Sequence, residues 1–238
     1  MKLEFHPKLF FYLTLGFVLA TVIGTVSHEG GHYIVAKSLG FNPHLGYAYV
    51  NYSDSKNIEA VKQYYKDNKK AIKDQDSDKR KHFDELKDKY YPKRWESFLI
   101  TLGGPLQTML TGSIGALLLW FRRKDIIATG ISFKQWIFVF LAFFWSREIF
   151  NLLGSIPAYI SGRGANLRGD EPKLAKMLGW PSWSVALLFA FMGAVILLWV
   201  TFYIIPKKER LTFILAGPLG AAIGWWFWLI KFGPVLLP

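Results

Sequence analysis

Five long apolar blocks constrain the fold of this chain more than any other feature of its sequence. They cover approximately residues 9–38, 96–121, 133–154, 183–205 and 211–232. An α-helix rises about 1.5 Å per residue, so each block is long enough to cross the roughly 30 Å hydrocarbon core of a bilayer. Only helices and closed barrels satisfy their own backbone hydrogen bonds in lipid. The sequence therefore predicts an all-α membrane protein, a polytopic helical bundle of about five spans.

The only sizeable polar segment lies between the first two blocks, at residues 41–94. It contains thirteen Lys/Arg and nine Asp/Glu residues. Apolar side chains recur at helical spacing from Ile58 to Tyr65, which indicates a solvated amphipathic helix. Residues 44–52 are aromatic and roughly alternating, which favours a short strand or hairpin. We therefore expect one polytopic domain over residues 1–238, with a small polar insertion at 41–94.

The charge of the chain favours a membrane partner over nucleic acid. The net charge is +12, but the basic residues flank apolar blocks or lie in the mixed-charge insertion, and no basic stripe is interleaved with aromatics. Cysteine is absent, which excludes disulfides and thiolate metal ligands. The apolar run from Leu9 to Val26 is longer than the core of a signal peptide. We expect an integral, multi-pass protein in contact with the lipid bilayer and binding no nucleic acid.

A metal-binding motif, His28-Glu29-Gly30-Gly31-His32, ends the first block. Histidines four apart lie one turn apart on one helix face, which is the geometry that chelates a single Zn2+ ion. The adjacent glutamate can act as general base on a zinc-bound water. In a chain of this composition the pattern occurs by chance about 0.003 times. The alternative is a set of polar residues at a helix end that reach into the interface, but ionisable groups within a span usually serve a function.

A third zinc ligand must come from elsewhere in the chain. The first and third blocks cross the membrane in the same direction, so residues at or after the end of the third return to the motif's side. Glu148, Asn151 and Asp170 lie there. Asp170 follows a glycine-rich segment, 161–169, but it also suits the cap of a short helix at 173–178. Glu148 and Asn151 share a helix face and suit a buried polar patch equally well.

These motifs together resemble the site-2 protease family of intramembrane zinc metalloproteases. The resemblance rests on the His28–His32 motif, on Gly103-Gly104-Pro105-Leu106 in the second block, and on Asn151–Pro157 at the end of the third. It covers about a third of the chain. The resemblance implies a zinc ion held by His28, His32 and Asp170. It also implies that Asn151 helps to hold the substrate or the oxyanion.

The expected function is therefore intramembrane zinc-dependent proteolysis. Glu29 would be the general base, and the substrate would be a single-span membrane protein. The alternative is a catalytically inactive, protease-like membrane scaffold or chaperone, although such a protein has no need of a base between two metal ligands. A diiron lipid desaturase would use more histidines than the five present. A metal transporter would carry acidic or histidine residues in several blocks, whereas here they cluster in two.

Overall fold

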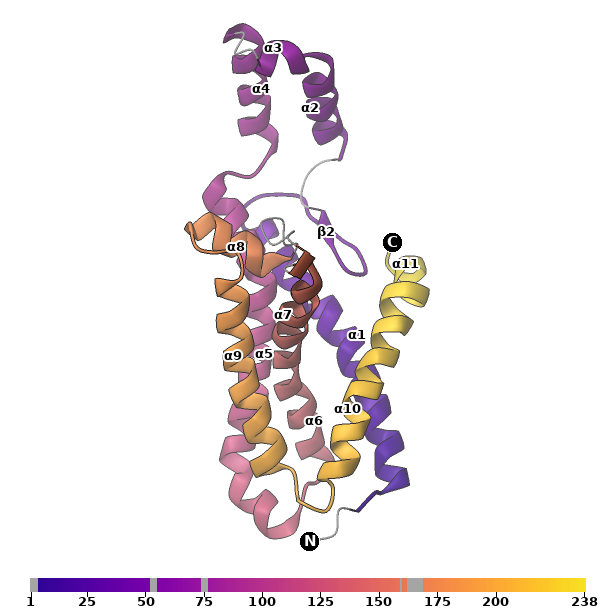
Figure 1. The fold of residues 1–238 in the computed structure, drawn as a ribbon. Coiled ribbons are helices and arrows are strands. Elements are labelled where there is room, and N and C mark those ends of the chain that lie inside the picture. The colour runs from indigo at the N-terminus through magenta and orange to yellow at the C-terminus, as the bar shows by residue number, and fades with distance from the viewer. Residues whose placement is uncertain (1–3, 52–54, 74–76, 159, 162–168) are drawn as a thin grey trace.

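Long helices form the body of the protein (Figure 1). The structure is a computed structural model that describes residues 4–51, 55–73, 77–158, 160–161 and 169–238. Within these residues, five helical segments are long and apolar enough to cross a membrane. The prediction of an all-α bundle of about five spans is confirmed.

The spans overlap all five predicted blocks. They are α1 (Pro7–Ser38), α5 (Arg94–Thr129), α6 (Phe133–Ala142) continued by α7 (Ser146–Ala158), α9 (Ser184–Trp199) with η4 (Val200–Ile204), and α10 (Arg210–Trp225) with η5 (Trp226–Phe232) and α11 (Gly233–Leu236). The third span is not one regular helix, because the 3₁₀ turn η1 (Phe143–Trp145) separates α6 from α7. There Trp145 is buried and packs against Gly112 of α5. This tertiary contact is not marked by any pattern in the sequence.

The polar insertion projects from one end of the bundle (Figure 1). It contains a two-stranded antiparallel hairpin, β1 (His44–Leu45) with β2 (Val50–Asn51), and the helices α2 (Ser55–Asp67), α3 (Lys69–Lys73) and α4 (Ser77–Tyr90). The predicted amphipathic helix corresponds to α2, and its Tyr65 ring packs on Phe83 of α4 at 5.3 Å between centroids. The predicted strand at 44–52 is a hairpin, because Gly46 and Tyr49 close a turn in its middle. Tyr52 lies outside the described residues.

Glycine allows the closest helix contact near the motif. A Cβ built on Gly103 of α5 would lie 2.6 Å from the carbonyl oxygen of Gly31, and one built on Gly31 would collide with the carbonyl oxygen of Gly103. The backbones of α1 and α5 therefore touch at this level. Small residues permit such an approach between membrane helices, where dispersion contacts replace the hydrophobic effect as the source of stability.

An aromatic core packs the opposite half of the bundle. Phe17 of α1 meets Phe140 of α6 edge to face, with ring centroids 5.2 Å apart, and meets Phe213 of α10 at 5.5 Å. Buried aliphatic side chains such as Leu119 and Val139 surround this group. The half with the insertion carries the polar residues instead, so the two ends of the bundle differ in chemistry.

Replacing Gly31 by alanine is expected to lower the midpoint of thermal unfolding, because the added methyl group would meet the Gly103 carbonyl. Overpacking of this kind costs about 1–3 kcal/mol. Gly30→Ala is the matched control, since nothing lies within 4 Å of a Cβ built there and alanine gains up to about 1 kcal/mol in helix propensity. Tryptophan fluorescence of the purified protein gives both midpoints. Equal midpoints would contradict the close contact of α1 with α5.

Candidate metal centre

The two motif histidines lie side by side on the inner face of α1. Their ring centroids are 5.0 Å apart. His28 is fully buried and His32 nearly so. Burial of both imidazoles follows from the four-residue spacing, which puts them on the face of α1 that packs against α5.

Asp170 meets both imidazoles from a different part of the chain. It is the first residue of α8 (Asp170–Leu178), which packs against α5 and α9 at the end of the bundle (Figure 1). Its Oδ2 lies 3.2 Å from Nε2 of His28 and 3.2 Å from Nε2 of His32. Gly169, with φ +118°, occupies the N-cap position of α8, and no side chain caps the helix. The cap interpretation of Asp170 is therefore wrong, and α8 begins earlier than the predicted residue 173.

The distances from Asp170 to the two imidazoles are those expected between ligands of a tetrahedral zinc site. All three ligand atoms lie within 4.8 Å of one another. Zinc–nitrogen bonds of about 2.0–2.1 Å in a tetrahedron place neighbouring ligand atoms about 3.3–3.4 Å apart, close to the observed 3.2 Å. His28, His32 and Asp170 form the one such group of acidic or histidine side chains among the described residues. Their roles as metal ligands stay a prediction.

Hydrogen bonds on the far side of each ring fix its orientation. Nδ1 of His32 lies 2.6 Å from the carbonyl oxygen of Ile100, and Nδ1 of His28 lies 2.8 Å from Oγ1 of Thr108. A carbonyl can only accept, so His32 must donate from Nδ1. A neutral His32 then turns the lone pair of Nε2 toward the carboxylate of Asp170. Two acceptors facing each other at this distance call for a cation between them, which is what a zinc ion supplies.

Gly104 leaves room for the metal ligands on the α5 side. A Cβ built there would lie 2.6 Å from Nε2 of His28 and would collide with Nε2 of His32. The hollow around both ligand atoms thus depends on a missing side chain, and any larger residue at this position would fill it.

The charge of Asp170 suits it to bind a cation. Burial alone would raise the pKa of its carboxyl group, but the neighbouring imidazoles of His28 and His32 outweigh burial and hold that pKa well below its usual range. Lys173 adds an ion pair, with Nζ 3.7 Å from Oδ1 of Asp170. Asp170 is therefore a carboxylate at neutral pH.

Glu29 is buried beside the ligands but is not one of the cluster. One of its carboxylate oxygens lies 3.8 Å from Nη2 of Arg147 on α7. This arrangement leaves Glu29 next to the ligand atoms, where the sequence predicts a general base.

The other predicted candidates, Asn151 and Glu148, lie on α7 and meet Glu171 rather than the imidazoles. The Asn151 side-chain amide donates to Oε1 of Glu171 at 2.7 Å. Glu148 and Glu171 are both buried and lie against each other. Glu148 is therefore outside the cluster, and Asn151 connects α7 to the helix that carries Asp170.

Several residues of the site were not predicted from the sequence. Thr108 and the carbonyl of Ile100 contact the imidazoles, and Gly104 leaves room for them. Glu171 contacts Asn151, and Arg147 contacts Glu29. Arg147 carried a signal as a basic residue inside an apolar block, and Gly104 as part of the glycine motif of the second block. The predicted glycine-rich turn at 161–169 lies mostly outside the described residues.

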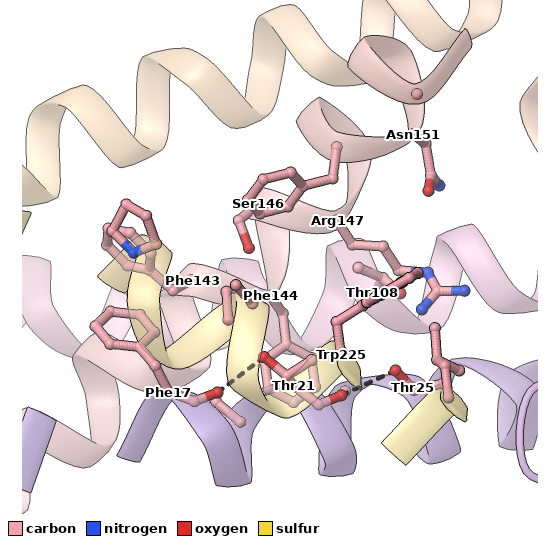
Figure 2. Close-up of a pocket in the computed structure, with 18 of the residues that line it drawn as sticks. Phe17, Thr21, Thr25, Thr108, Phe143, Phe144, Ser146, Arg147, Asn151 and Trp225 are labelled. Carbon is pink, nitrogen blue, oxygen red and sulfur yellow. Dashed lines mark hydrogen bonds between the residues drawn. The ribbon is translucent and has the colours of Figure 1, made fainter. Parts of the chain in front are cut away.

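A cavity of about 650 Å³ lies along α1, between α7 and α10. Figure 2 shows its lining: Arg147 and Thr25 stand at one end, while Phe17 and Phe143 stand at the other. Thr108 lines the cavity and also binds His28, so the polar end of the cavity is one side chain away from the cluster. An elongated, mostly apolar chain with one polar section would fit this space.

Comparison with known proteins finds no match for the chain among family models, curated proteins or solved structures. The chemistry of the site must therefore be argued from its own residues.

Asp170→Asn is expected to weaken zinc binding by more than about 100-fold, because an amide oxygen is a poor ligand and lacks the carboxylate charge. Glu148→Gln, the matched control on α7, is expected to leave zinc affinity within about threefold, since Glu148 is outside the cluster. Competition with a chromogenic chelator measures both. Greater zinc loss in Glu148→Gln than in Asp170→Asn would refute the assignment.

Thr108→Val removes the hydroxyl that orients His28 while keeping the volume of the side chain. Lost orienting contacts typically cost 10–100-fold in metal affinity, and we expect a loss of about that size. The control is Thr111→Val, one turn along α5, where the hydroxyl accepts from Gln107 instead. Equal zinc affinities in the two variants would mean that Thr108 has no orienting role.

Proposed function

We propose that the chain is an integral, multi-pass membrane protein that acts as a zinc metalloprotease of the site-2 protease kind on membrane-embedded substrates. One observation carries the proposal: Oδ2 of Asp170 lies 3.2 Å from Nε2 of His28 and 3.2 Å from Nε2 of His32, and the adjacent Glu29 is buried. The five apolar helical segments support the membrane location.

Each residue of the site has a task in peptide hydrolysis. A zinc ion supplies positive charge that polarises a carbonyl and makes water easier to deprotonate near neutral pH. Glu29 accepts the proton of the attacking water on a carboxylate oxygen and later passes it to the amide nitrogen that leaves. Ile100 and Thr108 keep the imidazoles turned toward the reaction. Burial of the site limits the water that reaches it.

The position of the site favours a substrate that arrives from the membrane. The cavity between α7 and α10 is lined by residues of the membrane-spanning segments. A single-span helix would have to unwind there, because the carbonyls of a helix are hydrogen-bonded and shielded. The β1–β2 hairpin stands at the same end of the bundle (Figure 1) and offers an edge for an extended peptide. Its turn is tied to the C-terminal helices, since Trp228 Nε1 donates to the Tyr47 carbonyl.

Model single-span substrates with Gly/Pro or with Leu near the cleavage site test this function. Unwinding breaks two or three helical hydrogen bonds at about 1 kcal/mol each, so the Gly/Pro substrate should be cleaved at least about tenfold faster. Gel analysis of reconstituted enzyme measures both rates.

Glu29→Gln is the control for the chemistry. It should keep its zinc and lose about 10²–10⁴-fold in rate. Equal cleavage of the two substrates, or efficient cleavage of an unfolded soluble protein alone, would refute an intramembrane substrate. A wild-type protein that binds the substrates without cleaving them would instead be the catalytically inactive scaffold or chaperone.

A further inference from the structure

Arg147 is a charged residue for which the expected mechanism has no task. It lies on α7, inside a membrane-spanning segment, and its side chain is 30% exposed. A charge within a span is costly and usually serves a function. Figure 2 shows its guanidinium at the polar end of the cavity, near Thr108 and Thr25.

Among the described residues, Arg147 has donor capacity to spare. Its contact with Glu29 is 3.8 Å long, beyond hydrogen-bond distance. Its buried Nε has no hydrogen-bond partner among the described residues. A guanidinium has five N–H donors, and Arg147 lines the cavity that a substrate would fill.

Asn151, which the family resemblance suggests for the oxyanion, has already used one of its donors. Its amide nitrogen donates to Oε1 of Glu171 at 2.7 Å. Leaving a buried carboxylate without this partner would be costly. Arg147 is therefore the better donor on α7 for a new negative charge.

We propose that Arg147 is the catalytic residue that stabilises the oxyanion of the tetrahedral intermediate; the proposal rests on the proteolytic function above. When water attacks, its oxygen bonds to the carbonyl carbon and the carbonyl π pair moves onto the carbonyl oxygen. Glu29 takes the proton. The carbon–nitrogen bond then breaks as the pair on oxygen returns, and the proton moves from Glu29 to the leaving nitrogen.

The ion pair with Glu29 suits Arg147 to this task. As Glu29 takes up a proton it loses its negative charge, and at the same moment negative charge grows on the substrate oxygen. Nη2 of Arg147 lies 3.8 Å from a carboxylate oxygen of Glu29. The guanidinium of Arg147 is paired with Glu29 before the step and with the substrate oxyanion during it. Because the cation is already in place, little reorganisation is needed.

Variants of Arg147 in zinc-loaded protein test the assignment with a model single-span substrate. Arg147→Gln should lower kcat by about 100-fold with zinc content unchanged. Arg147→Lys keeps the charge but loses the planar fork, so a loss of about tenfold is expected. Lys176→Gln is the control: it removes a positive charge from an exposed side chain of α8, and it should change kcat by less than about threefold.

Binding of phenylphosphonate, a tetrahedral anion with an apolar ring, gives a second readout that needs no turnover. Its dissociation constant for the zinc-loaded protein, measured by calorimetry, should rise at least about tenfold in Arg147→Gln. Unchanged phosphonate affinity would overturn the proposal, as would a loss of zinc that matches the loss of kcat. A wild-type protein without zinc-dependent cleavage would refute the proteolytic function instead. Phosphonate binding would then still test whether Arg147 binds a tetrahedral anion. If Arg147→Gln does not fold, kcat and the phosphonate dissociation constant are measured in Arg147→Lys.

Discussion

The backbone contact between α1 and α5 is the constraint on which the rest of the site depends. Gly31 touches Gly103, and this contact fixes which face of α5 meets the motif. On that face Ile100 and Thr108 bind the two imidazoles from behind. Gly104 between them leaves the hollow in which the ligand atoms converge. The contact residues are spaced three or four apart on both helices, so they share one face of each helix. A shift of one residue along either helix would separate the imidazoles from their partners on α5.

The second requirement is a fixed position for the carboxylate of Asp170. Residues buried along α8 (Glu171, Leu174 and Ala175) hold that helix against its neighbours. The hydrogen bond from Asn151 to Glu171 adds a polar tie to α7. Acidic side chains thus gather at this end of the bundle, and Arg147 is a basic side chain among them, with Nη2 3.8 Å from Glu29. A bound cation would offset much of the remaining charge.

The sequence predicts the regular parts of this structure and the local part of the site. Span positions follow from apolar length, and the shared face of His28 and His32 follows from their spacing. Topology makes Asp170 a candidate without separating a ligand from a cap, and only the family resemblance favours the ligand. That distinction depends on how α8 packs, which is a tertiary property. The same holds for Thr108 and for the pairing of Arg147 with Glu29, since contacts between distant segments leave no periodic signal.

Zinc K-edge X-ray absorption of the purified protein, with stoichiometry from elemental analysis, tests the central claim most directly. The account predicts about one zinc per chain, bound by nitrogen and oxygen at about 2.0–2.2 Å. Two imidazoles should be visible by multiple scattering, and no sulfur should be present, since the chain has no cysteine. One imidazole should disappear in His28→Ala. A shell of about six oxygens without imidazole, unchanged by that substitution, would contradict a zinc centre at this site.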